Sequence, residues 1–463
     1  MSMTKLVDGL EVAIFRHRAA VIDFFVLLTG FLLYQATQLK MGASFTKNIP
    51  LKHEYMQTYL KHRKDFGGAN GILVSVCDTQ GNIFNPAFFD ALKGVHDQLF
   101  FIPGINRTQV KSLFSPSTRF TEVVEDGFAG GPVIPADFKP DTRGLDIVKG
   151  NVEKAGIVGR LVADDYSCAM VSGQLLEINP ETGEALDTLA FAEQLESQVR
   201  GEFEKDNISI HVIGFAKMVG DVAEGAKGVL MFFAIAIAIT AVMVFFFSKS
   251  LTLTLLPILC SLVAVVWQLG LLTVIGFGLD PMSILVPFLV FAIAVSHSVQ
   301  MINAIGKKVA TGMDSKSAAA SSFRSLLVPG GIALLSDTIG FLTLLTIDIG
   351  VIRELAITAS LGVAVIILTN LVLLPVLVSY FTFSPRYIQK VSSPSPMADR
   401  LWTKMAGFAT NKWAYPVLVI CAVMFIAGHQ YAQKMKIGDL HAGAPALHED
   451  SRYNQDTFLI TDK

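Results

Sequence analysis

Hydrophobic and polar positions divide the chain into long apolar runs and one long mixed region. Each apolar run has the length of a membrane helix, which needs about 20 residues to cross the hydrocarbon core of a bilayer. The runs are residues 19–39, 228–247, 253–275, 282–305, 326–347, 355–381 and 413–430. The pattern predicts an α-helical polytopic membrane protein with about seven spans, five of them clustered as a bundle over residues 228–381.

The mixed region, residues 40–225, has short strand-like segments that alternate with amphipathic helical segments. Their order is β-α-β-β-α-β, which is typical of a ferredoxin-like α+β domain. A segment rich in Gly and Pro interrupts this order at residues 115–154 and predicts irregular structure. Its glycines lack the GxGxxG spacing and no helix opens directly after them, so we interpret the segment as a loop that does not bind phosphate.

Three further segments complete the predicted organisation. Residues 1–18 are a short basic N-terminus, and residues 382–412 are a Ser/Pro-bearing linker that contains a short amphipathic piece. The first apolar run could be a cleaved signal peptide, but no small-x-small cleavage site follows it, so we predict an uncleaved first span. Residues 431–463 resemble the exit of the first span, with Lys436 and Gly438 matching Lys40 and Gly42. This likeness predicts the start of a second outer domain, in a parallel second repeat of a longer protein.

Composition excludes several classes of function. The chain is 52% hydrophobic and 16% charged, with a mean hydropathy of +0.52, and these values indicate an integral membrane protein. The net charge is −2 without a basic block, which argues against nucleic-acid binding. No nucleophile–base set, metal-ligand spacing or phosphate loop is recognisable, so we expect no enzyme activity, no cofactor and no metal site.

Basic residues predict the orientation of the spans. Lys249, the group from Lys307 to Arg324 and the linker up to Lys412 all fall on the same side as the basic N-terminus. By the positive-inside rule this side is cytoplasmic, so residues 40–225 face outward. Cys77 and Cys168 lie in that outer region and could form a disulfide if the region is extracytoplasmic, although the sequence favours two free thiols.

The span at residues 282–305 carries the most unusual chemistry. It has no Lys, Arg, Asp or Glu, yet it contains His297. A titratable imidazole in a membrane span is costly unless it has a partner or lines a wet cavity. Asp337, in the next span, is the candidate partner. Counting from the cytoplasmic ends puts the two groups at depths of roughly 12 Å and 16 Å, at 1.5 Å per residue.

We therefore predict that His297 and Asp337 form a buried proton relay, with Ser296 in its hydrogen-bonded path. The alternative is that His297 is a neutral packing residue and that Asp337 caps a helix break. A second group in the same span (Ser298, Gln300 and Asn303) is predicted to form a polar face that holds helices together.

Two stretches carry a family resemblance, GLDPMSILVPFLVFAIAVSHSVQMINA and the segment from SDTIGF to LLPVLVSYF. They resemble the resistance–nodulation–cell division (RND) superfamily, in particular the MMPL-type exporters and their sterol-sensing-domain, Patched-like relatives. The second stretch matches a GF-then-LLP segment through Gly340, Phe341, Leu373, Leu374 and Pro375. The resemblance implies a proton-driven exporter of lipid-like or other hydrophobic compounds in a bacterial inner membrane. It also implies contact with membrane lipids, a homo-oligomer, a porter-like outer domain and a possible periplasmic partner.

The sequence departs from the family pattern at one informative place. Family members commonly carry a Gly-x-Asp-Tyr-like motif in the fourth span, whereas this chain has Ala294, Val295, Ser296 and His297 at the matching positions. Because the acid is missing, we interpret His297 with Asp337 as its substitute. Two alternatives follow if that interpretation fails: a sterol-sensing-type receptor or scaffold that binds lipid without pumping, and an accessory to protein export of the SecD/SecF kind.

Overall fold

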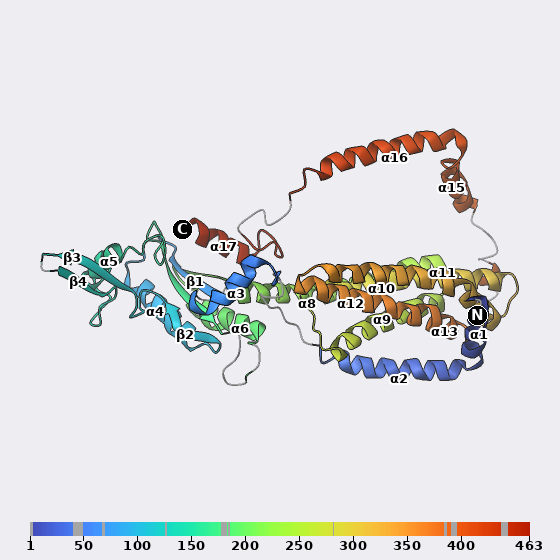
Figure 1. Cartoon of the computed structure of the whole chain (residues 1–463), viewed down its shortest axis with the longest axis horizontal. Helices are drawn as coiled ribbons and strands as arrows, with labels where there is room; N and C mark the ends of the chain where they lie inside the picture. Colours follow the sequence, from blue (N-terminus) through green and yellow to red (C-terminus); the bar gives the residue numbers. More distant parts are fainter. Residues whose placement is uncertain are drawn as a thin grey trace. The chain divides into compact units, whose positions relative to one another are not determined.

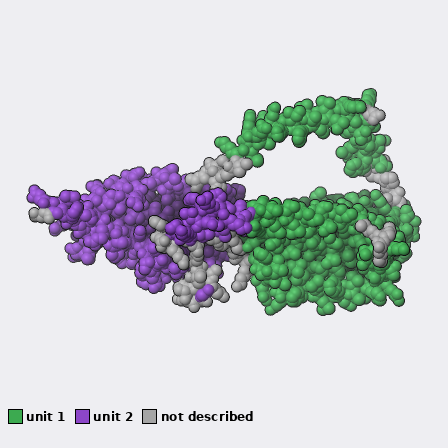
Figure 2. All heavy atoms as spheres, viewed as in Figure 1, with its two compact units in different colours: residues 1–40, 230–347, 351–440 green, residues 41–229, 348–350, 441–463 purple. Residues whose placement is uncertain are grey.

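The computed structural model describes residues 3–39, 50–66, 70–125, 127–176, 183, 186–280, 282–383, 387–389, 396–436 and 443–463. These residues form two compact units (Figure 2), and each is described by itself. Unit 1 comprises residues 1–40, 230–347 and 351–440, and unit 2 comprises residues 41–229, 348–350 and 441–463. Pro281, parts of the predicted linker and the first part of the predicted second domain, at 437–442, lie outside the described residues.

Unit 1 is helical (Figure 1). Its helices are α1 (Met3–Arg16), α2 (Arg18–Ala36), most of α8 (Phe215–Ser248), α9 (Leu251–Val274), α10 (Val286–Ala310), α11 (Ser315–Thr343), α12 (Gly350–Leu368), α13 (Leu374–Val378), α15 (Pro396–Gly407) and α16 (Asn411–Ala432), with short turns η3 (Ser283–Leu285), η4 (Leu344–Thr346) and η5 (Thr369–Leu373). Among the described residues, 7 helical segments are long and apolar enough to cross a membrane. The prediction of about seven spans is confirmed.

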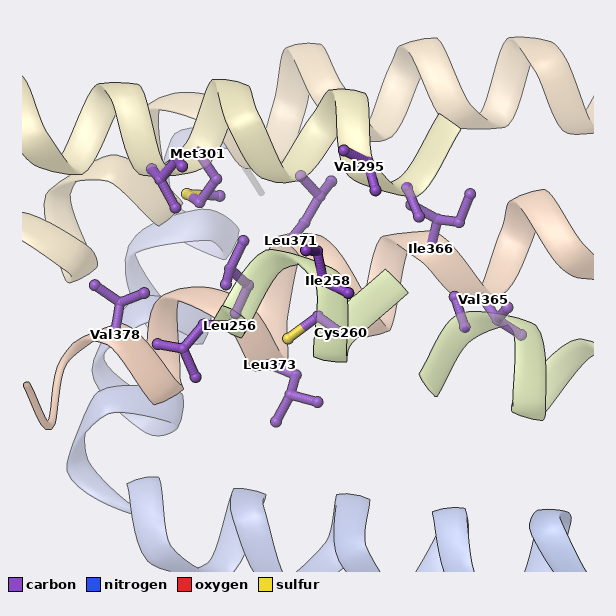
Figure 3. Close-up of a cluster of buried hydrophobic side chains, with 14 of the residues drawn as sticks. Leu256, Ile258, Cys260, Val295, Met301, Val365, Ile366, Leu371, Leu373 and Val378 are labelled. Atoms are coloured by element: carbon purple, nitrogen blue, oxygen red, sulfur yellow. The ribbon is translucent and has the colours of Figure 1, made fainter. Parts of the chain in front are cut away.

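Three of these segments form the centre of unit 1. Over an 18-residue window of each segment, the share of buried residues is 61% for α9, 44% for the segment containing α10 and 67% for the segment containing α12 and α13, but only 11% for α2 and for the segment containing α11. Figure 3 shows side chains from α9, α10 and the α12–α13 segment packed against one another, among them Ile258, Val295 and Leu371. Dispersion contacts between such apolar side chains hold membrane helices together, because lipid leaves little hydrophobic driving force.

Helix α2 packs on the outside of this core, against α9. The ring of Phe25 stacks on Trp267 with 5.1 Å between centroids, and Trp267 Nε1 donates a hydrogen bond of 2.9 Å to Thr29 Oγ1. The two backbones approach closely at Gly270, where a Cβ atom would lie only 2.3 Å from Leu32 O. A small residue is therefore required at this crossing.

Unit 2 contains a four-stranded antiparallel sheet in the order β2-β5-β1-β6 and a separate hairpin β3–β4. The strands are β1 (Gly71–Asp78), β2 (Ile105–Lys111), β3 (Arg119–Val124), β4 (Gly127–Pro132), β5 (Cys168–Leu175) and β6 (Ile208–Gly214). Its helices are α3 (Glu54–Phe66), α4 (Pro86–Phe101), α5 (Thr142–Ala155), α6 (Thr188–Gln194), η2 (Leu195–Arg200), α7 (Gly201–Phe203) and α17 (Arg452–Asp462). The hairpin and α5 occupy most of the segment at 115–154, which the sequence predicted to be irregular.

Strand β1 lies in the middle of the sheet and shows why the strands pair in this register. Val74 lies opposite Val171 of β5 and Val212 of β6, and all three side chains are fully buried. At the end of the same strand, Cys77 lies opposite Cys168, and the two form a disulfide. The possibility of this disulfide, left open by the sequence, is confirmed.

Helix α17 covers the free edge of β6. Val212 N donates to Asp456 Oδ2 over 3.0 Å, and Gly214 N donates to Tyr453 Oη over 3.3 Å. Arg452 Nη2 donates to Ile210 O over 3.0 Å. Side chains of α17 thus satisfy backbone groups that an edge strand would otherwise leave free to pair with another strand. The chain at 443–463 therefore packs within unit 2, and a second outer domain stays a prediction.

Asp456 anchors α17 and is fully buried. Its carboxylate lies 2.7 Å from Arg200 Nη2, 2.8 Å from His211 Nδ1 and 3.0 Å from Arg452 Nε. Burial alone would raise the pKa of this carboxyl. The hydrogen bond from His211 and the charge of Arg200 outweigh burial and hold the pKa well below its usual range.

Candidate functional site

Four buried polar residues meet where α9, α10 and η5 cross inside unit 1. Asn370 is fully buried, and its Nδ2 lies 2.5 Å from Ser298 Oγ, 2.6 Å from Ala294 O and 3.3 Å from Ser261 Oγ. Its Oδ1 accepts a hydrogen bond of 2.7 Å from Thr369 Oγ1. One amide side chain therefore joins three helical segments. We call Ser261, Ser298, Thr369 and Asn370 the amide cluster.

The amide cluster depends on a local irregularity of the helix. Thr369 and Asn370 open the π-helical turn η5, and Thr369 Oγ1 also lies 3.2 Å from Val365 O. A π-helical turn inside an α-helix widens one turn, is rare, and is frequently found at functional sites. The turn sits between α12 and α13, the most buried segment of unit 1.

A further buried amide lies on the same side of α9 as Ser261. Gln268 follows Ser261 by seven residues, roughly 10 Å along a helix, and its side chain is fully buried. Its Nε2 lies 3.5 Å from Thr358 O, whereas its Oε1 has no hydrogen-bond partner among the described residues. An unpaired buried acceptor is costly. Ser261 and Gln268 therefore place two buried polar side chains along one side of α9, inside the bundle.

His297 lies beside the amide cluster on α10. It is half-buried, and its Nδ1 lies 3.0 Å from Ile293 O. Because a carbonyl only accepts hydrogen bonds, Nδ1 carries a proton and donates this bond. A Cβ atom placed on Gly330 of α11 would lie 3.9 Å from His297 Cδ2. The imidazole ring therefore packs against α11 at Gly330.

Asp337 lies further along α11 and is exposed. It follows Gly330 by seven residues, which is two helical turns or roughly 10 Å. The structure therefore does not bring His297 and Asp337 into contact: they lie about two helical turns apart along α11, whereas residue counting put them about 4 Å apart in depth. The error arose because the ends of α10 and α11 were placed at the ends of the apolar runs, whereas both helices continue several residues beyond them.

The polar residues of α10 lie on two different faces. Ser298 is fully buried in the amide cluster, whereas Ser296, Gln300 and Asn303 are exposed. The exposed three are spaced four and then three residues apart, so they share one side of the helix. The predicted single polar face of Ser298, Gln300 and Asn303 is thus divided. We call Ser296, Gln300 and Asn303 the outer polar stripe.

Sequence reasoning identified Ser298 but missed its partners. Asn370 is a single amide within a long apolar run, and this alone could have marked it as a functional candidate. The π-helical turn that directs its side chain into the bundle has no sequence signature. Ser261 and Gln268 were accessible, because a seven-residue spacing of polar residues in an otherwise apolar span indicates one helix face.

Chemically, the site offers amide, hydroxyl and imidazole groups. Among the described residues, no group of three or more His, Cys, Asp or Glu side chains is arranged to hold a metal ion. The amide cluster can fix helices in register, and His297 places an imidazole next to it on α10.

Comparison with known proteins adds two findings. The model of the MMPL family matches residues 135–415. The chain is also 21% identical over 375 residues to the protein named "Putative membrane protein MJ1562" of Methanocaldococcus jannaschii, covering 76% of this chain and 88% of that protein. The matched stretch from 135 to 415 includes α8 to α13, and thus both the amide cluster and the outer polar stripe.

Proposed function

Because this chain belongs to the MMPL family of the RND superfamily, we propose that it is a proton-motive-force-driven exporter of lipid-like or other hydrophobic compounds. Its seven candidate spans and family membership support a membrane transporter in general. Proton coupling rests on the chain's own residues. The observation that supports it is the hydrogen bond from His297 Nδ1 to Ile293 O, which leaves Nε2 as the ring nitrogen proposed to exchange the proton.

His297 is proposed to take up and release the coupling proton. A charge on an isolated imidazolium would be costly in hydrocarbon, so protonation favours a conformation in which water or an acid reaches Nε2. One proton that crosses about 150 mV supplies roughly 3.5 kcal/mol, which is enough to shift an equilibrium between two access states by more than 100-fold.

Asp337 is proposed as the second proton-carrying group. It does not contact His297, so a proton would travel roughly 10 Å along the helix axis from one side chain to the other. Ser296 is exposed on α10 one residue before His297 and is the proposed intermediate. This step requires an ordered water path along α10 and α11 when the site is open. The relay is thus proposed as three separated groups and no longer as a contacting pair.

The topology of the proposal follows from charge and covalent chemistry. The disulfide between Cys77 and Cys168 supports an oxidising, extracytoplasmic environment for unit 2. Together with the basic residues beside the spans it supports a cytoplasmic N-terminus. The proposed location is a bacterial inner membrane, which rests on the family resemblance alone. The antiparallel strand order β2-β5-β1-β6, with helices between β1 and β2 and between β5 and β6, supports a ferredoxin-like porter domain.

The outer polar stripe supports a protein partner inside the membrane. Exposed amides and hydroxyls at membrane depth are unfavourable in lipid, so Gln300 and Asn303 should face water or another helix. Amide side chains donate and accept hydrogen bonds, so this stripe could pair with a second copy of itself. We therefore propose a homo-oligomer. A periplasmic partner of unit 2 is proposed from the family resemblance alone.

The proposal is tested by efflux from proteoliposomes that contain the intact protein and a fluorescent lipid analogue. We expect export to follow an imposed proton gradient, to stop when an ionophore collapses it, and to move protons in the opposite direction. Export that persists unchanged without a gradient would refute proton coupling.

The second candidate is a sterol-sensing-type receptor or scaffold that binds lipid without pumping. It is favoured by the lack of an acid at Ser296 and by the buried, unpaired Oε1 of Gln268, which a ligand hydroxyl could satisfy. Saturable lipid binding that is independent of the proton gradient, in the absence of any export, would establish this alternative.

A further inference from the structure

An open pocket lies in unit 2, where β1 ends and α4 begins. Its volume is about 530 Å³, within the range of about 300–1,000 Å³ that small-molecule sites occupy. Residues of the segment 78–91 line one wall, and residues of the segment 203–208, which leads into β6, line the other. Asp78 and Ile208 lie opposite each other in the β1–β6 pair, so the register of the sheet brings the two walls together. The pocket shares no residue with the amide cluster or the outer polar stripe.

One carboxylate of this pocket is fixed in place by the chain itself. Asp78 is only 7% exposed; its Oδ1 accepts a hydrogen bond of 2.7 Å from Gln80 N, and its Oδ2 accepts one of 2.7 Å from Asn85 Nδ2. Asn85 in turn caps α4, because its Oδ1 accepts a hydrogen bond of 2.9 Å from Phe88 N. An ionised carboxylate offers about four acceptor positions. Asp78 therefore keeps acceptor capacity for a ligand, and its position is set before a ligand binds.

The rim of the pocket carries polar side chains that the fold does not use. Gln80, Asp90, Asp206 and Asn207 are exposed, and their side chains make no hydrogen bond or ion pair with other described residues. They come from both walls, so carboxylate oxygens and amide groups surround one opening. A carboxylate accepts hydrogen bonds, whereas an amide side chain both accepts and donates them. The rim thus offers both kinds of hydrogen-bonding group to a bound molecule.

The charge of the lining narrows the class of ligand. Its three aspartates outnumber Lys205, so the pocket disfavours anions although α4 begins here. Among the described residues, no three His, Cys, Asp or Glu side chains are placed to hold a metal ion. An ammonium ion only donates, so it would leave the NH₂ groups of Gln80 and Asn207 unmatched. Hydroxyl groups donate and accept, so a neutral molecule with several of them can match carboxylates and amides together.

The same pocket has an apolar wall. Ala87, Ala91 and Phe203 line it. The half-buried ring of Phe203 packs closely against α4 at Gly94, where a Cβ atom would lie 2.2 Å from Phe203 Cε1. Small-molecule sites typically combine apolar walls with a few well-placed polar groups. A sugar ring has hydroxyl groups around its edge and C–H bonds on its faces, so it fits a pocket with a polar rim and an apolar wall.

We propose that this pocket of unit 2 binds a neutral sugar, either as a free compound or as the headgroup of a glycolipid. Asp78 and Asp90 accept hydrogen bonds from the sugar hydroxyl groups, Gln80 and Asn207 donate to them, and a face of the ring rests against Phe203. The site is independent of proton coupling, so it can be tested separately from the proposed export.

Ligand-detected NMR on the intact protein tests this site. The protein is reconstituted in nanodiscs of phosphatidylcholine, whose headgroup carries no hydroxyl group. Saturation transfer is measured to D-glucose, D-galactose, D-mannose and maltose, with ethanolamine as a cationic probe. Asp90→Ala and Gln80→Ala each remove one exposed polar group from the pocket. Asp97→Ala, which removes a carboxylate of the same helix α4 outside the pocket, is the matched control.

We expect saturation transfer to at least one of the four sugars and unchanged binding by Asp97→Ala. Binding by Asp90→Ala should be about tenfold weaker, because a hydrogen bond to a charged group is lost. The octyl glycoside of the bound sugar then identifies the source of the ligand. Competition equal to that of the free sugar supports a free compound, and stronger competition supports a glycolipid headgroup.

Three results would overturn the proposal. The first is the absence of transfer to every sugar. The second is equal binding by the wild type, Asp90→Ala and Gln80→Ala, because the sugar would then contact another part of the protein. The third is displacement of the sugar by ethanolamine, because the pocket would then be a site for organic cations.

Discussion

The buried carboxylate of Asp456 gives the sharpest test of how unit 2 is assembled. We consider Asp456→Asn, which keeps the shape of the side chain and removes its charge. The carboxylate receives hydrogen bonds from Arg200, Arg452 and the Val212 amide and is paired with His211. An asparagine in this position places its NH₂ group against at least one of these donors, so one hydrogen bond becomes a repulsion between donors.

The magnitude follows from the burial of the pair. Removing one partner of a buried ion pair costs about 3–5 kcal/mol. Arg200 keeps a second carboxylate, Glu196, at 3.0 Å, so we take the lower value of about 3 kcal/mol. At 1.36 kcal/mol per tenfold change, the population in which α17 has left β6 should rise roughly 100-fold.

Hydrogen–deuterium exchange on the intact protein measures this opening, because α17 caps the amides of Val212 and Gly214. We expect peptides covering β6 and α17 to exchange faster in Asp456→Asn. Asp450→Asn, on an exposed residue of the same segment, is the matched control and should match the wild type. Unchanged exchange in β6 with Asp456→Asn would refute the assignment of Asp456 as the anchor.

The same carboxylate predicts a pH dependence. The pKa of Asp456 is depressed in the folded state, so its contribution is fully present above the pKa of an unfolded aspartate, about 3.9. It is lost as the pH falls below that value toward the folded pKa. Acid should therefore release α17 in the wild type below about pH 4, and Asp456→Asn should lack this acid-dependent step.

Three further variants test other parts of the structure. Asn370→Ala removes two short interhelical hydrogen bonds and should lower the free energy of unfolding of the bundle by about 1–2 kcal/mol. Unfolding is measured by titration with a denaturing detergent, and an unchanged unfolding midpoint would exclude a structural role for the amide cluster. Gly270→Ala forces a Cβ atom against Leu32 O and should cost about 1–3 kcal/mol in the same assay, whereas Gly340→Ala, with open space around it, should be neutral. Replacing Cys77 by Ser opens a loop of 91 residues and should lower the stability of unit 2 by about 4 kcal/mol; equal melting of this variant and the wild type would mean that the disulfide is not formed in the purified protein.

Much of the architecture could be predicted from the sequence because its periodicity is strong. The spans have continuous apolar runs, and Asn85 followed by Pro86 marks the start of α4, where Asn85 Oδ1 accepts a hydrogen bond from Phe88 N. Long-range pairing was harder to predict. The capping of β6 by α17 joins residues separated by 244 positions, and no local pattern announces such a contact.

The site shows why side-chain placement could not be predicted. Helical spacing correctly put Gln300 and Asn303 on one side of α10, but Ser298 and Ser296, two residues apart, face opposite environments. Pairing His297 with Asp337 required the relative depth of two helices. The predicted ends at 305 and 326 differ from the observed ends at Ala310 and Ser315, and this difference changes the relative depth by more than one turn. Asn370 depends on a π-helical turn, which tertiary packing decides.

The central claim is that His297 carries the coupling proton, and counting protons moved per molecule of substrate exported tests it most directly. Proteoliposomes with a trapped pH indicator would compare the wild type with His297→Gln and with Asn303→Ala, an exposed residue of the same helix, after equal insertion is verified. We predict that His297→Gln abolishes both proton movement and gradient-driven export, while Asn303→Ala retains both. Unchanged proton-coupled export by His297→Gln would contradict the account and identify His297 as a packing residue.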